Sequence, residues 1–273
     1  MRGESKSGVS MWPREHGAIS MLVQPAVCAA LIAWRWHWVV IPALAAAAAM
    51  FLVREPLVVL ARQKWVWRDA KPETPVARRW VLSLAPVMAA CGALMAMRWQ
   101  ISWLLAFGAG AVAMTVYAVW MTVKNRQRSV SLQIISAFGL ASTGMAVAMS
   151  LEDTVSQWAA WLWLLSAAQA AAGILVVHTR LESRISAKAR RAESPVYIRA
   201  AWVMQAVMAS LGVAAWWVSP VAAAAMLLPA AVHVYELMTI RTEKAMATPL
   251  RTIGFRAMGL SIAVSVLLVI GLR

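Results

Sequence analysis

The stretch WPREHGAISMLVQPAVCAALIAW, residues 12–34, decides the fold of this chain. Three ionisable residues, Arg14, Glu15 and His16, stand directly before an apolar run that continues to Trp34. Charge at the edge of a hydrophobic span costs free energy, so it usually marks a site in a membrane protein. The stretch therefore predicts a membrane-spanning helix with a polar site where the helix begins.

The composition of the whole chain indicates the same class. Of its 273 residues, 62% are hydrophobic and 14% are charged, whereas about a quarter of a soluble domain is charged. The formal net charge of +15 would suit a nucleic-acid partner, but the basic residues lie in short loops between apolar segments. We therefore expect an all-α, polytopic membrane protein with a single transmembrane domain over residues 1–273, surrounded by membrane lipids and without a nucleic-acid partner.

Outward from the first span, long apolar segments recur along the chain. A spanning helix needs roughly 20 mostly apolar residues, and nine segments approach this length. Residues 218–220, Val-Ser-Pro, separate the seventh segment from the eighth, and this turn signal favours two helices over one. The nine predicted spans are 17–34, 38–60, 80–97, 101–122, 130–150, 157–178, 199–218, 220–238 and 254–272.

Positive charge predicts how the chain sits in the membrane. With the spans as given, 23 Lys and Arg residues fall on one side, and only Arg35, Arg98 and Arg273 fall on the other. The positive-inside rule places residues 1–16 in the cytoplasm and, with nine spans, the carboxyl terminus outside. We expect a multi-pass protein of the bacterial cytoplasmic (inner) membrane, with Glu152 and Asp153 in a solvated outer turn.

Several residues inside the spans predict how the helices pack. Pro25 should kink or unwind its helix and free backbone groups that need partners. Small residues, here Gly108, Gly110, Gly139 and Gly144, allow helices to approach closely.

Polar residues within the spans collect at one depth, the cytoplasmic leaflet, and we predict that they line a cavity there. Intramembrane ionisable residues are usually functional, although a structural role stays open for each. His233 and Glu236 stand three residues apart and can meet, whereas Arg54 and Glu55 are adjacent and cannot cancel each other. The candidate catalytic residues are His16, Glu55, His178, Glu182, His233 and Glu236. The candidate substrate-binding residues are Arg54, Arg62, Tyr117, Lys124, Arg126 and Arg180.

These residue types suggest roles. Arginine and lysine bind phosphate through charge-assisted hydrogen bonds, so the ligand is expected to be a lipid-like or isoprenoid-like anion. In an enzyme, Glu55 and Glu236 would be the carboxylates, the histidines would move protons, and Arg54 and Arg180 would stabilise negative charge. His and Glu side chains can also bind metals, but their spacing forms no recognised cluster, so metal and cofactor stay unknown.

The motif Trp12-Pro13-Arg14-Glu15-His16-Gly17-Ala18, with Pro25 shortly after it, resembles the signature of the bacterial YwiC-like membrane proteins. The rest of the chain is similar to the general layout of that family. This resemblance implies an architecture rather than a reaction.

A second resemblance, over spans two to seven, is to the UbiA superfamily of intramembrane prenyltransferases. Tyr117 followed by Lys124 and Arg126, and then by residues 131–144, is similar to the Tyr and Lys-Arg segment of that superfamily. Residues 177–182 stand in the place of its second Asp-rich motif. The resemblance implies a UbiA-like bundle and a divergent, prenyltransferase-like transferase that acts on an isoprenoid diphosphate.

The chain departs from the UbiA pattern where magnesium would bind. The first motif region reads Arg54-Glu55-Pro56, and the second offers only His178 and Glu182, whereas magnesium prefers hard oxygen ligands. We therefore expect weak dependence on magnesium. The alternative is a transporter or a non-catalytic membrane component. A transporter would need polar residues through the midplane, where Ser142, Thr143 and Ser166 are the main candidates.

Overall fold

The computed structural model describes residues 11, 16–69 and 71–273, apart from the side chains of His16 and Leu250. Residues 12–15 of the opening motif lie outside the described residues. All regular structure in the described ranges is helical. The elements are α1 (His16–Ala33), α2 (Val40–Arg62), the π-helix η1 (Gln63–Trp67), α3 (Thr74–Met95), α4 (Ile101–Val123), α5 (Val130–Glu152), α6 (Gln157–Ala189), α7 (Pro195–Trp216), α8 (Pro220–Met238), α9 (Glu243–Ala247) and α10 (Leu250–Leu272).

The all-α membrane class is confirmed, and each predicted span overlaps one of the long helices. Within the described ranges, seven helices are long and apolar enough to cross a bilayer, and α1 is a shorter apolar helix. Helix α3 is not among the seven, because every stretch of it long enough to span includes Arg78 and Arg79. The count of nine crossings and the sides of the two termini stay predictions.

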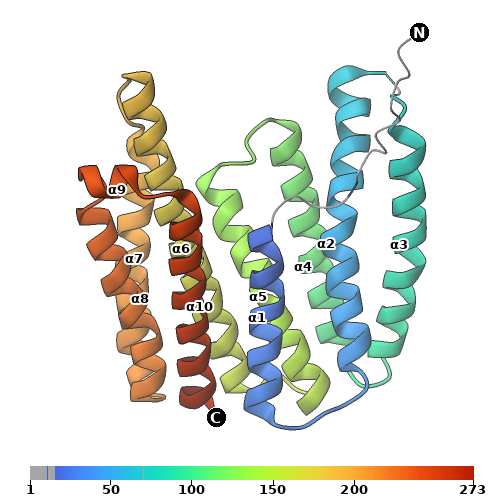
Figure 1. Ribbon diagram of the computed structural model, residues 1–273. Helices are drawn as coiled ribbons and strands as arrows, with labels where there is room; N and C mark the ends of the chain where they lie inside the picture. Colours follow the sequence, from blue (N-terminus) through green and yellow to red (C-terminus); the bar gives the residue numbers. More distant parts are fainter. Residues whose placement is uncertain (1–10, 12–15, 70) are drawn as a thin grey trace.

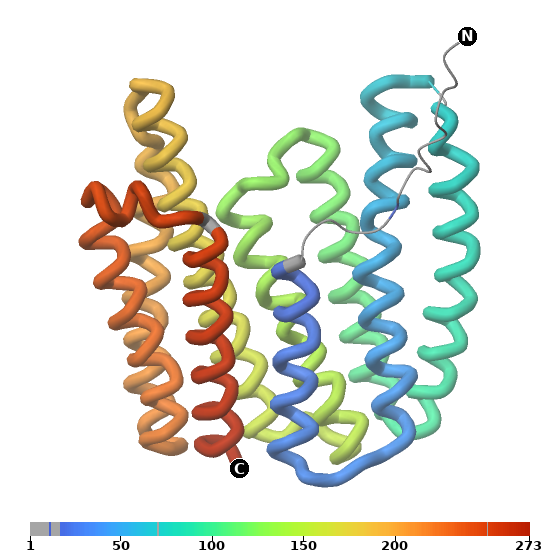
Figure 2. The backbone as a smooth tube through the Cα atoms, viewed as in Figure 1, coloured from blue at the N-terminus to red at the C-terminus, as the bar shows by residue number. Residues whose placement is uncertain are grey.

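The helices form a bundle with α5 and α6 at its centre (Figure 1). Helices α7 and α8 lie at one edge, α2 and α3 lie at the other, and α1 packs beside α10. The main core consists largely of Ala, Leu, Val and Met from α1, α5, α6, α7, α8 and α10. Figure 2 shows that the α2–α3 and α6–α7 connections project beyond the rest at the same end of the bundle.

The seventh and eighth segments are separate helices, as the Ser-Pro signal predicts. Helix α8 begins at Pro220, whose missing N–H costs nothing at a first helical position. Ser219 caps the helix, since its hydroxyl accepts a hydrogen bond from the Val221 N–H at 3.2 Å.

The crossing of α1 and α5 depends on Pro25 and Gly144. A Cβ atom on Gly144 would lie 2.9 Å from the Pro25 carbonyl oxygen, so only glycine allows this approach. Beside it, the Thr143 hydroxyl donates to the Leu22 carbonyl at 2.6 Å and so supplies a side-chain partner in the turn that precedes Pro25. The prediction of close packing is wrong for Gly108 and Gly110, which face open space.

The expectation of a solvated turn holds for Asp153, whose side chain is 50% exposed, but not for Glu152, which ends α5 with a side chain that is 16% exposed. Glu152 accepts hydrogen bonds from Arg35 at 2.8 Å and from the Trp158 indole at 3.1 Å, and Asp153 pairs with Arg98. The third basic residue predicted on this side, Arg273, lies 5.1 Å from the Trp34 ring centre. The few cations at this end of the bundle are thus all engaged in structural contacts.

Candidate functional site

A half-open cavity of about 2670 Å³ is lined by residues of α1, α2, α3, α4, α5, α6 and α10, and some of them, such as Val112 and Ile262, are exposed at the surface of the bundle. Its wall is apolar over most of its length, with Ala, Met, Leu and Gly from several helices. The charged and imidazole residues of the lining are Arg54, Glu55, Glu73, Arg128 and His178, which stand in or toward the α2–α3, α4–α5 and α6–α7 connections; we call this the charged end. At the opposite end, the lining includes Trp99 and Trp103.

The charged end is assembled from distant parts of the chain. Arg54 and Glu55 are half-buried on α2, directly before Pro56. On α6, the His178 ring stacks on the Tyr197 ring of α7, with 5.4 Å between ring centres and 13° between planes. The Tyr197 hydroxyl in turn donates a hydrogen bond to the Arg128 carbonyl oxygen. This chain of contacts joins α6, α7 and the α4–α5 loop beside the cavity.

One wall of the cavity is held by an amide–hydroxyl network between α1 and α10. The Gln24 amide nitrogen donates to the Ser261 carbonyl at 3.0 Å, and the Ser261 hydroxyl donates to the Gln24 amide oxygen at 2.7 Å. Ser265 also accepts from the Gln24 amide. These polar groups satisfy one another, so this wall needs no further partner.

Three of the predicted site residues, Arg54, Glu55 and His178, are among the residues that line the cavity. His16 begins α1, and its neighbours Gly17 and Ala18 line the cavity, but its side chain lies outside the described part of the chain.

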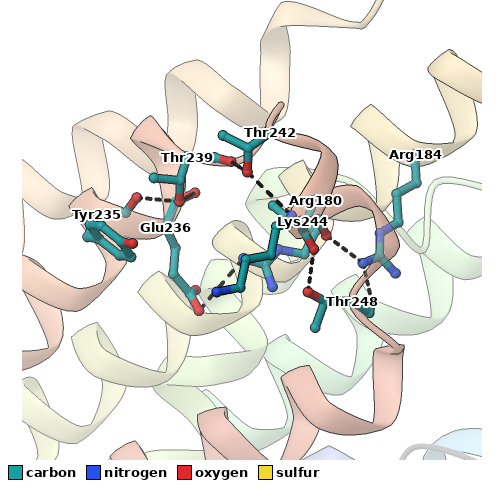
Figure 3. A network of polar contacts seen from close by, with 9 residues as sticks. Arg180, Arg184, Tyr235, Glu236, Thr239, Thr242, Lys244 and Thr248 are labelled. Atoms are coloured by element: carbon teal, nitrogen blue, oxygen red, sulfur yellow. Dashed lines mark hydrogen bonds and ion pairs between the residues drawn. The ribbon is translucent and has the colours of Figure 1, made fainter.

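A second polar cluster lies between α6 and α8, as Figure 3 shows. Arg180, which is 5% exposed, faces Glu236 with 3.7 Å between Nη2 and Oε1. His233 is also buried on α8. One turn beyond Arg180, Arg184 donates to the Ala245 carbonyl at 2.9 Å and to the Thr248 carbonyl, at the end of α9. None of these four charged or imidazole side chains is among the residues that line the cavity.

Glu182 stabilises the turn between α6 and α7. Its carboxylate accepts hydrogen bonds from Arg191 at 3.0 Å, from the Ser194 N–H at 3.3 Å and from the Ser186 hydroxyl at 3.2 Å. These bonds give Glu182 a structural role at the end of α6.

Three of the four remaining predicted binding residues make side-chain contacts within the protein. Arg62 donates to the Thr122 carbonyl at 3.0 Å, near the end of α4. The Tyr117 hydroxyl lies 2.9 Å from the Ser131 hydroxyl, and Lys124 Nζ lies 4.0 Å from the Trp120 ring centre. Arg126 is exposed in the α4–α5 loop.

The cavity also includes residues that the sequence prediction missed, chiefly Glu73 and Arg128. Both stand in loops from which the sequence prediction selects other residues, Arg62 in one and Lys124 and Arg126 in the other. Arg128 is separated from Arg126 by one residue, and no sequence pattern distinguishes which of the two lines a cavity. Among the described residues, no group of three or more His, Cys, Asp or Glu side chains could hold a metal ion.

Comparison with known proteins gives one family. The sequence model of the family described as "YwiC-like protein" matches residues 12–149, about half of the chain, from the opening motif into α5. No curated protein matches the chain.

Proposed function

This chain belongs to the YwiC-like family, and we propose that it is a multi-pass membrane protein that binds an anionic amphiphile in its cavity. The ligand is lipid-like or isoprenoid-like, with its head group at the charged end and its tail along the apolar wall. The observation that carries the proposal is the confinement of charge to one end of a long, otherwise apolar cavity.

Arg54 and Arg128 are the head-group residues in this proposal. Guanidinium groups bind phosphate or carboxylate through paired, charge-assisted hydrogen bonds. Glu55 and Glu73 also line the cavity and repel an anion, so the negative charge of the ligand must lie closer to the two arginines than to the two glutamates. This mixture of charges favours a head group of defined orientation over a loosely held counterion.

Affinity in the membrane then depends on the head group. A hydrocarbon tail gains little by moving from lipid into an apolar cavity, because lipid tails are as apolar as leucine. The two arginines therefore decide whether the ligand is retained.

Native mass spectrometry of protein extracted in mild detergent tests this proposal. Wild-type protein should carry an anionic amphiphile, and the Arg54→Ala, Arg128→Ala double variant should lose it. The matched control is Lys124→Ala with Arg126→Ala, which removes two cations of the same loop that do not line the cavity; it should keep the ligand. Equal retention by both double variants, each with an unchanged thermal transition, would refute the proposal.

A divergent, prenyltransferase-like activity is a narrower form of the same proposal. It is supported by Glu55 and His178, a carboxylate and an imidazole that share the charged end and could exchange protons with a bound substrate. Incubation with prenyl diphosphates and aromatic or lipid acceptors should give turnover that a chelator leaves nearly unchanged and that Glu55→Gln abolishes. Turnover that the chelator abolishes would contradict the idea that protein cations replace magnesium.

A transporter is the second candidate. It is favoured by one feature, the extension of the cavity lining from the charged end past Thr143 and Ser166 to Trp99 and Trp103. Flux of the ligand across sealed liposomes would favour this candidate, whereas ligand binding without flux would favour the binding protein or enzyme.

A further inference from the structure

Two neutral polar side chains, Ser166 and Gln169, stand on the cavity face of α6. Both line the cavity, and each is 8% exposed. They are three residues apart, so they lie on the same side of the helix. In the part of the chain that the structure describes, neither side chain makes a hydrogen bond, in contrast to the mutually satisfied Gln24 and Ser261 on the wall formed by α1 and α10.

The amide of Gln169 needs partners. It carries two N–H donors and one carbonyl acceptor, and an amide left unpaired in an apolar environment costs more than a typical hydrogen bond contributes. The Gln169 side chain borders the cavity and has no hydrogen-bond partner within the protein. Its partner is therefore a molecule that occupies the cavity.

We propose that Ser166 and Gln169 form a subsite for an uncharged oxygen, a hydroxyl or a carbonyl, in the middle of the bound amphiphile. This inference rests on the proposed function and adds a second recognition point to it. The residues that follow Gln169 on the cavity face, Ala170 and Gly173, have small side chains. A Cβ atom on Gly173 would meet nothing within 4 Å, so there is open space beside Gln169. A substituent on the chain of the ligand therefore has room there.

The position along α6 sets the spacing within the ligand. Gln169 precedes His178, at the charged end, by nine residues, which is roughly 13.5 Å along the helix axis at 1.5 Å per residue. An extended chain advances about 1.2 Å per bond, so the uncharged oxygen should follow the head group by about eleven bonds. A plain acyl or isoprenoid tail has no polar atom there.

A pair of probes that differ only at this position tests the subsite. Stearate and 12-hydroxystearate have the same carboxylate and chain length, and the second adds a hydroxyl eleven bonds from the carboxyl carbon. Each probe competes with tritiated stearate for protein in phosphatidylcholine nanodiscs. For each protein we take the ratio of the affinities of the two probes. The two probes partition differently into the bilayer, and dividing the wild-type ratio by the variant ratio removes this difference.

The variants are Gln169→Leu with Ser166→Ala, and the matched control Gln205→Leu. Gln205 is also buried and has an amide oxygen without a partner, but it stands on α7 and does not line the cavity. We expect wild type to favour 12-hydroxystearate roughly three- to tenfold, the value of one neutral hydrogen bond. The preference should be kept in Gln205→Leu and lost in the α6 variant.

The remaining outcomes separate the two proposals. Binding of both probes with the same relative affinity in wild type and in the α6 variant would overturn the subsite and leave the anionic-amphiphile proposal intact; water would then be the partner of Gln169. Binding of neither probe to wild type would overturn the anionic-amphiphile proposal and the subsite with it.

Discussion

At the scale of single residues, variants of the Arg180–Glu236 pair test whether these two side chains stabilise the fold or act in catalysis. Arg180 is almost fully buried, and Glu236 is its only ionic partner among the described residues. Removing one member of a buried pair leaves an uncompensated charge, which typically costs about 3–5 kcal/mol. We therefore expect Arg180→Met or Glu236→Leu alone to lower the thermal transition strongly, and the double variant to recover much of the loss. Single variants as stable as wild type would contradict a structural pair.

The same pair shows what the sequence could and could not predict at this scale. Depth along the chain selected Arg54, Glu55 and His178, which line the cavity, and also Arg180, which does not. Depth does not give direction around a helix, which turns about 100° per residue. Arg180 follows His178 by two residues, so it projects about 200° away and meets α8 instead of the cavity.

At the scale of elements, the crossing of α1 and α5 limits how residue 144 can change. In Gly144→Ala, the new methyl group would press on the Pro25 backbone, and such overpacking costs about 1–3 kcal/mol. Gly139→Ala on the same helix is the matched control, because its methyl group would meet only the flexible end of Met114. We expect a clearly larger drop in the thermal transition for Gly144→Ala, and equal drops would contradict the close crossing.

Helix positions were largely predictable, because long apolar segments leave little choice of structure in a bilayer. The predicted boundaries differ most at α3, which begins at Thr74 instead of residue 80, and at α6, which continues to Ala189. Both extensions are polar helix beyond an apolar segment, and hydropathy marks only the apolar part. The roles of the glycines depended on helix orientation, which separates Gly144 from Gly108 and Gly110.

At the scale of the whole molecule, α3 decides the topology. With α1 counted as a crossing beside the seven long apolar helices, α3 makes nine spans and places the carboxyl terminus outside; without α3, eight spans place both termini on one side. We expect a reporter fused after Arg273 to be active only outside the cytoplasm, in agreement with the charge asymmetry. Activity of a cytoplasmic reporter at this position would show an even number of crossings.

The most direct test of the central claim is an experimental density map of the protein purified with its native lipids. We expect elongated density in the cavity, with its head group against Arg54 and Arg128 and its chain passing Gln169 on α6. Density whose head group lies instead at the end lined by Trp99 and Trp103, or a cavity closed by side chains, would contradict it.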